Sequence, residues 1–432
     1  MYRYIVFFFI MATLLSNHTT AQPATDAALS KILFSNPHPV VQQVLQQPQT
    51  YRLQVIYTQI NRNAKNEPSF TNYYFNHDPQ LYFNPASMVK LPLAILSLEK
   101  LNTLHSKGID KYTTLQFDSS QPWQQPLYKD STAPGEKPTI AHFIKRALLI
   151  SENDPYNRMY QFVGQQQTNR RLHGMGYKNT RITRQFAGLT TEQNRHTPAV
   201  RFVKEDGTLL YVQQPAYNED AFDFSQQIKL GKAYMNRQDS LLHQPFDFTE
   251  HNNLPLFDLQ QMLQSILFPQ SVPAAQRFNL SAADYQFLYQ YLSQYPSEAS
   301  YPKYDTTAFY DSYVKFFFRD STQRMPSHVR VFNKVGWSYG FLTDVSYIAD
   351  FKNGVEYMLA VTVYVNSDGI LNDGKYDYDS IGYPFLYQLG QTIYQYEQQR
   401  KRAHKPDLSR FKIKYEKRDP NDTRPALKDV DN

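Results

Sequence analysis

The chain has 432 residues, of which 41% are hydrophobic and 15% aromatic, so it can bury a substantial core and is not a disordered protein. It contains no cysteine, which excludes disulfide scaffolds, thiolate-bound zinc and cysteine nucleophiles. The formal net charge is +6, but residues 400–432 alone hold 11 Lys and Arg against 6 Asp and Glu. A nucleic-acid protein would spread basic charge over its folded face, so we expect no nucleic-acid partner.

The first 21 residues have the layout of a cleavable secretory signal. Arg3 supplies a positive start, residues 5–15 are apolar except for Thr13, and a small-residue site ends at Ala21. This apolar run is shorter than the about 20 residues that cross a bilayer. We therefore expect cleavage, a secreted or periplasmic protein, and no integral membrane span after cleavage.

Hydrophobic periodicity predicts a clear order of elements after the signal. Runs rich in β-forming residues predict strands at 51–60, 69–75, 329–335, 340–351 and 355–365. Apolar helical patterns predict helices at 87–104, 139–150, 154–163, 256–267, 282–295 and 384–399. The dipeptide Asn353-Gly354 predicts a hairpin between the last two strands.

This order predicts an α+β fold. Strands from both chain ends can share one antiparallel sheet flanked by helices, while the middle of the chain forms an enlarged, mostly helical lobe. We expect one domain over residues 22–399, with the lobe at about 105–325 and an extra segment within 200–325. The charged residues 400–432 read as a basic, disordered tail.

Three short motifs fall in order along the chain: Ser87-Met88-Val89-Lys90, Ser151-Glu152-Asn153 and Lys334-Val335-Gly336. Ser87 and Lys90, three residues apart on a helix, lie on the same face. Ser87 would stand at the helix N-terminus, where free N–H groups favour a developing negative charge. Burial and the second ammonium of Lys334 would lower the pKa of Lys90, which could then take the serine proton.

The other motif residues suit the remaining steps of an acyl transfer. Ser151 can relay a proton to a leaving nitrogen, and Asn153 can hold Lys90 or a substrate amide. Lys334, on a strand, can supply positive charge for a substrate carboxylate.

The ordered trio resembles the serine β-lactamase and penicillin-binding protein superfamily, and most closely the class A β-lactamases. The resemblance covers roughly residues 50–400 and implies the β-lactamase/transpeptidase-like fold, with no cofactor and no metal. It implies that Ser87, Lys90 and Ser151 are catalytic. It also implies substrate contacts from Asn153, Lys334, Gly336 and Trp337, with the backbone N–H groups of Ser87 and Trp337 forming the oxyanion hole.

The chain departs from the family at three positions. Class A enzymes carry a glutamate in a loop after the second motif, and the corresponding stretch here, 181–198, has Glu192 as its only acid. Glu192 is therefore the candidate deacylation base, against the alternative of a solvated loop glutamate. Val335 replaces the usual Thr or Ser and cannot donate a hydrogen bond, while Glu152 replaces the more usual Asp.

Two other serines carry competing motifs. Ser312 to Lys315 repeats the Ser-x-x-Lys spacing, but it lies too near Lys334 to leave room for a helical lobe, and we interpret it as an ordinary helix pair. Ser338 stands in a Gly-x-Ser-x-Gly pattern typical of α/β-hydrolases, but a hairpin follows it instead of a helix. The only later histidine, His404, lies in the charged tail.

Three functions remain open at this point. The first is a class A β-lactamase-like serine hydrolase of the bacterial envelope that acts on a β-lactam or a related amide through an acyl ester on Ser87. The second is a peptidoglycan D-amino-acid peptidase, transpeptidase or esterase with slow β-lactam turnover. The third is a non-catalytic envelope binding protein that keeps the fold. The expected partner is a small-molecule β-lactam or a peptidoglycan-like substrate.

Overall fold

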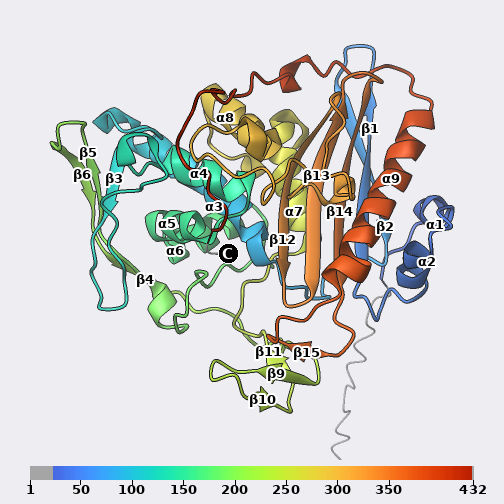
Figure 1. Cartoon of the computed structure of the whole chain (residues 1–432), viewed down its shortest axis with the longest axis horizontal. Coiled ribbons are helices and arrows are strands. Elements are labelled where there is room, and N and C mark those ends of the chain that lie inside the picture. The colour runs from blue at the N-terminus through green and yellow to red at the C-terminus, as the bar shows by residue number, and fades with distance from the viewer. Residues whose placement is uncertain (1–22, 431–432) are drawn as a thin grey trace, which may run out of the picture.

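The computed structural model describes residues 23–430, so the predicted signal at 1–21 lies outside the described residues. At its centre is a five-stranded antiparallel sheet in the order β12-β13-β14-β1-β2. These strands are β1 (Gln54–Arg62), β2 (Pro68–Phe75), β12 (Val329–Ser338), β13 (Phe341–Asp350) and β14 (Val355–Tyr364). Strands from both parts of the chain therefore share one sheet, and the predicted α+β fold class is confirmed (Figure 1).

Except at the edge strand β2, the sheet is largely buried on both faces, because its side chains alternate between two apolar cores. Along β1, Val55 and Tyr57 belong to one core, and Ile56 and Ile60 to the other. Helix α9 (Tyr383–Gln399) covers one face, and α1 (Ala27–Phe34) and α2 (Pro39–Gln46) pack against α9 (Figure 1). Helix α7 (Leu256–Leu267) and α8 (Ala282–Ser293) lie on the opposite face.

The helical lobe is built around α3 (Lys90–Leu104), which follows a short 3₁₀ turn, η1 (Ala86–Val89). Most side chains of α3 are buried, as expected for a helix that is apolar on nearly every side. Around it lie α4 (Ile140–Leu149), α5 (Asn153–Val163) and α6 (Gln165–Gly174). The lobe carries at its outer end a small sheet of β3 (Thr114–Phe117), β5 (Val200–Val203) and β6 (Leu209–Gln213).

The prediction of a mostly helical section over residues 200–325 is confirmed at α7 and α8 but is wrong for residues 200–250. Besides β5 and β6, this stretch forms short strands joined by tight turns, for example at Gly207, whose φ is +87°. Turn residues every few positions leave no run long enough for a helix. These strands are β7 (Ala216–Tyr217), β8 (Lys229–Leu230), β9 (Ala233–Met235), β10 (Leu241–Leu242) and β11 (Phe246–Asp247). Two strands from outside the stretch pair with them: β4 (His196–Thr197) with β7, and β15 (Ile370–Leu371) with β9.

The prediction of a disordered tail is also wrong for residues 400–430, which pack along the body of the protein. Phe411 is fully buried against aromatic rings that include Phe268 and Tyr347. Glu416 accepts two 2.8 Å hydrogen bonds from Lys145 Nζ, and Leu427 forms a parallel β-bridge with Tyr304. The charged composition of this segment predicted disorder, but the contacts of a few apolar and acidic residues hold it against the rest of the protein.

Within residues 23–430, no helix is both long and apolar enough to cross a bilayer. Over the same residues, no three His, Asp or Glu side chains are grouped so that they could hold a metal ion.

Candidate active site

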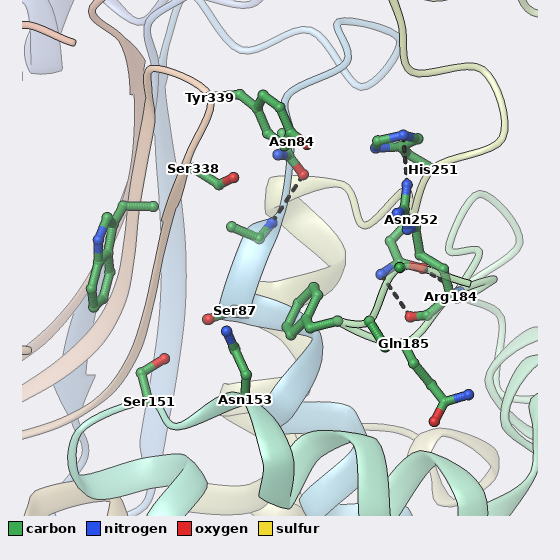
Figure 2. Close-up of a pocket in the computed structure, with 15 residues that line it drawn as sticks. Asn84, Ser87, Ser151, Asn153, Arg184, Gln185, His251, Asn252, Ser338 and Tyr339 are labelled. Atoms are coloured by element: carbon green, nitrogen blue, oxygen red, sulfur yellow. Dashed lines mark hydrogen bonds between the residues drawn. The ribbon is translucent and has the colours of Figure 1, made fainter. Parts of the chain in front are cut away.

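Ser87 lies in η1, at the point where the chain enters helix α3. The preceding residue, Ala86, has a φ of +44°, a left-handed conformation that is unfavourable for alanine. The Asn84 side chain accepts a 3.2 Å hydrogen bond from the Ala86 N–H and so helps to hold this turn (Figure 2). The strained turn places Ser87 at the wall of a cavity of about 520 Å³.

Lys90 lies one turn further along and is fully buried beneath Ser87. Its Nζ donates to Ser87 Oγ over 2.8 Å and to Asn153 Oδ1 over 2.7 Å, and it also contacts the Ser151 carbonyl oxygen. Burial, together with the Lys334 ammonium, holds the pKa of Lys90 well below its ordinary value, although Glu152 acts in the opposite direction. The structure therefore brings the serine, the lysine and the second motif into contact.

Ser151 links the two lysines of the site. Its φ is +72°, so its backbone is also held in a left-handed conformation. Lys334 Nζ donates to Ser151 Oγ over 2.8 Å, and Lys90 Nζ lies 3.4 Å from the same oxygen. Burial lowers the pKa of Lys334, Asp344 opposes this shift, and Lys315 adds to it. The Ser151 hydroxyl is thus positioned to pass a proton.

Strand β12 is an edge strand, and its unpaired edge faces η1. Gly336 makes this approach possible, because a Cβ there would lie 2.5 Å from the Pro85 carbonyl oxygen and 3.0 Å from the Met88 nitrogen. The next residue, Trp337, lines the cavity while its ring packs edge-on against Phe316 at 5.8 Å. Glycine at position 336 therefore keeps the backbone of Trp337 beside the nucleophile turn.

Glu152, in the middle of the second motif, is buried and serves the structure of the loop. It accepts hydrogen bonds from Arg146 Nε over 2.8 Å and from Tyr304 Oη over 2.7 Å. Glu152 thereby fixes the segment that carries Ser151 and Asn153. Glutamate is one methylene longer than the more usual aspartate, and its carboxylate contacts both Arg146 and Tyr304.

Glu192, the predicted deacylation base, does not reach the cavity. Its carboxylate lies on the surface, 3.5 Å from His196 Nε2 and 3.9 Å from Arg195 Nε, and its side chain is 65% exposed. The prediction for Glu192 is wrong because the loop turns this residue outward at the start of a short 3₁₀ turn (Gln193–Arg195). Among the described residues that line the cavity, none is acidic.

Phe186 lies in the loop stretch where the resemblance places a glutamate. Its ring lies 5.2 Å from Lys90 Nζ and 4.5 Å from the ring of Tyr156. Its backbone is held at both ends by Asn157, which accepts from the Phe186 N–H over 2.8 Å and donates to the Phe186 carbonyl over 3.2 Å. An aromatic ring, and not a carboxylate, therefore covers the lysine.

The two competing serines do not have catalytic partners. Ser312 lies in a turn and Lys315 directly after it, so the interpretation of this pair as a helix pair is wrong. Lys315 Nζ donates to Asn333 Oδ1 over 2.6 Å and to the Leu292 carbonyl over 2.8 Å. Ser338 lines the cavity, but strand β13 follows it after a tight turn. Over residues 23–430, no hydrogen bond connects Ser338 to a histidine.

Several residues of the cavity wall carried no motif in the sequence. Arg184 and Phe186 fall within the stretch 181–198, which the family resemblance marked as important without indicating these side chains. Tyr339 stands beside Ser338 in the Gly-x-Ser-x-Gly pattern, which did not point to its side chain, and the other residues come from segments with no functional signal. These are Asn84, His251 and Asn252.

Comparison with protein families identifies one match. Residues 41–206 match the model of the β-lactamase enzyme family. The family resemblance is confirmed over this segment. The matched segment contains the first two motifs. The third motif lies outside it in sequence but contacts the second through the hydrogen bond from Lys334 to Ser151. A comparison with curated proteins finds no match.

Several solved structures are distantly similar to the chain. A β-lactamase from Desulfarculus baarsii is 14% identical, covering 86% of this chain and 97% of its own, with a TM-score of 0.45. A β-lactamase from Xanthomonas campestris is 11% identical, covering 84% and 98%, with a TM-score of 0.46. A β-lactamase from Sphaerobacter thermophilus is 14% identical, covering 83% and 96%, with a TM-score of 0.42.

Proposed function

We propose that the chain is a secreted serine hydrolase of the β-lactamase type that forms an acyl ester on Ser87 with a β-lactam or a related amide. The observation that carries this proposal is the 2.8 Å hydrogen bond between Lys90 Nζ and Ser87 Oγ at the cavity wall. A solvated cap serine would not need a fully buried lysine beneath it. Burying a lysine without an acidic partner is costly, and a catalytic role accounts for that cost.

Acylation would begin when unprotonated Lys90 takes the proton of Ser87 Oγ. The oxygen then bonds to the substrate carbonyl carbon, and the resulting oxyanion accepts hydrogen bonds from the backbone N–H groups of Ser87 and Trp337. The carbon–nitrogen bond breaks, and the nitrogen takes a proton from Ser151 Oγ. Lys90, which holds the serine proton, returns it to Ser151, so the step ends with an ester on Ser87 and an amine.

Release of the ester is the step that this site supports least. Hydrolysis needs a base that activates a water, and the described residues that line the cavity include no carboxylate. Phe186 instead presents an apolar ring toward Lys90. We therefore propose fast acylation followed by slow hydrolysis.

Intact-mass spectrometry with a penicillin over time tests both steps. We expect one adduct that maps to Ser87, appears quickly and disappears slowly. Ser87→Ala should give no adduct, whereas Ser338→Ala, which removes another hydroxyl of the same cavity, should react like the wild type. Equal labelling of the wild type and Ser87→Ala would favour a non-catalytic envelope binding protein.

A second candidate is a peptidoglycan D-amino-acid peptidase, transpeptidase or esterase. The cavity without a carboxylate favours it, because an acyl group that water removes slowly can be transferred to an amine acceptor. Release of D-alanine from a D-alanyl-D-alanine peptide, or its exchange with an added D-amino acid, would support this candidate over a β-lactamase.

Export to the periplasm is part of the proposal and rests on residues 1–21 alone. Cell fractionation should find the mature protein outside the cytoplasm, and N-terminal sequencing should begin at Gln22. A cytoplasmic protein that retains Arg3 would contradict it.

A further inference from the structure

Arg184 lies on the cavity wall in the loop that also carries Phe186, across the cavity from strand β12 (Figure 2). Its Nη1 forms a 2.6 Å hydrogen bond with His251 Nε2. Burial, with a contribution from Arg184 itself, lowers the pKa of His251 to about 3. His251 is therefore neutral at physiological pH, so it accepts from the guanidinium without compensating its charge.

The charge of Arg184 has no anionic partner among residues 23–430. No carboxylate of the described part of the chain lies within ion-pair distance of it, although Arg184 also lines an adjoining cavity whose wall includes Asp247 and Glu250. The guanidinium of nearby Arg181, by contrast, donates hydrogen bonds to two backbone carbonyls, those of Asp223 and Thr249. Arg184 thus presents an uncompensated cation to a cavity that has no acidic lining residue.

The backbone of Arg184 is fixed, so its side chain does not depend on a mobile loop. Asn252 Oδ1 accepts from the Arg184 N–H over 3.0 Å, and Asn252 Nδ2 donates to the Arg184 carbonyl over 3.3 Å. The next residue, Gln185, donates its N–H to Asn194 Oδ1 over 2.8 Å. A guanidinium held in this way loses little freedom when it binds a carboxylate.

The position of Arg184 indicates which part of a substrate it would meet. Ser151 and Lys334 mark the side on which the leaving nitrogen is protonated. Figure 2 shows Arg184 on the other side of Ser87, so the acyl part of a substrate would extend toward it. We propose that Arg184 is a specificity-determining residue that binds an anionic group, such as a carboxylate, on the acyl side of the scissile bond.

This inference rests on the proposed acylation of Ser87, and a matched pair of substrates tests it. Benzylpenicillin and its α-carboxy derivative differ by one carboxylate on the acyl side chain. We expect the wild type to be acylated by the α-carboxy compound about tenfold or more faster at limiting concentration, the size expected for a charge-assisted hydrogen bond. Arg184→Gln should abolish this preference, mainly through weaker binding before acylation.

Arg237→Gln is the matched control, because it removes an exposed arginine whose Nη1 lies 3.4 Å from the carbonyl of Gly188 in the same loop. It should keep the preference, which separates local binding from a general loss of positive charge. Arg184→Lys keeps the charge and should keep part of the preference, provided that thermal unfolding shows an intact fold. Equal rates for the two penicillins in the wild type, or the same ratio in Arg184→Gln, would overturn the role of Arg184. Absence of any Ser87 adduct with both compounds would contradict the proposed function instead.

Discussion

Lys334 and Lys90 converge on a single hydroxyl: Lys334 Nζ lies 2.8 Å from Ser151 Oγ, and Lys90 Nζ lies 3.4 Å from it. Both lysines are buried, and the Lys334 ammonium adds to the effect of burial in lowering the pKa of Lys90. Lys90 is consequently the group whose loss of a proton should control acylation.

The pH dependence of acylation should report this pair. Lys90 acts as a base only when unprotonated, so the acylation rate should rise with pH through a pKa well below 10.5 and fall as the pH drops below that pKa. Lys334→Gln removes a cation that lowers the pKa of Lys90, so the acid limb of the profile should move to higher pH. The profile is measured with a chromogenic β-lactam in the pre-steady state.

Lys107→Gln is the control for this experiment, since it removes an exposed lysine outside the site. Its profile should match that of the wild type. An unshifted acid limb in Lys334→Gln would show that the two ammonium groups do not interact as the geometry indicates.

Gly336→Ala should damage both stability and acylation. The added Cβ would lie 2.5 Å from the Pro85 carbonyl oxygen, so strand β12 must move away from the nucleophile turn. We expect a loss of about 1–3 kcal/mol in the free energy of unfolding and a marked fall in the acylation rate, because the Trp337 N–H is displaced. Urea denaturation and adduct formation measure the two effects.

Gly174→Ala provides the comparison, because a Cβ at this position in helix α6 meets nothing within 4 Å. This variant should be as stable as the wild type or slightly more so. Similar losses in the two variants would contradict a specific close approach at Gly336.

Phe411→Ala tests whether the C-terminal segment is part of the folded body. The Phe411 ring is fully buried, so its removal should lower the free energy of unfolding by about 3–5 kcal/mol. Phe34→Ala, at a phenylalanine that is 42% exposed, should cost less than about 1 kcal/mol. A negligible effect at Phe411, measured by chemical denaturation, would mean that residues 400–430 do not pack on the protein in solution.

Phe186→Ala should shorten the lifetime of the acyl ester. The ring lies 5.2 Å from Lys90 Nζ, and its removal would leave space for water beside a basic nitrogen. We expect adduct formation on Ser87 to persist while the adduct is lost faster than in the wild type, as followed by intact mass. Phe222→Ala, at a partly exposed ring that does not line the cavity, should release the adduct at the wild-type rate. An unchanged lifetime in Phe186→Ala would exclude this ring as a barrier to water.

Most helices and the strands of the central sheet can be predicted from the sequence, because they depend on the spacing of apolar residues within each segment. The helix at 256–267 was predicted with the bounds that the structure has, since its apolar spacing follows the helical period without a breaker. The central strands were found from their β-forming residues and the Asn353-Gly354 turn. Residues 200–250 were misjudged, because strands of two to five residues are too short for periodicity to distinguish them.

The sequence by itself determined the pairing of Ser87 with Lys90. Residues three apart on a helix lie on one face, and this does not depend on the tertiary contacts of the helix. Only the tertiary structure decided which groups surround that pair. It turned Glu192 outward, set Phe186 over Lys90, and joined Arg184 to His251 across 67 residues of sequence. Such contacts depend on how whole segments pack, and no local spacing encodes that.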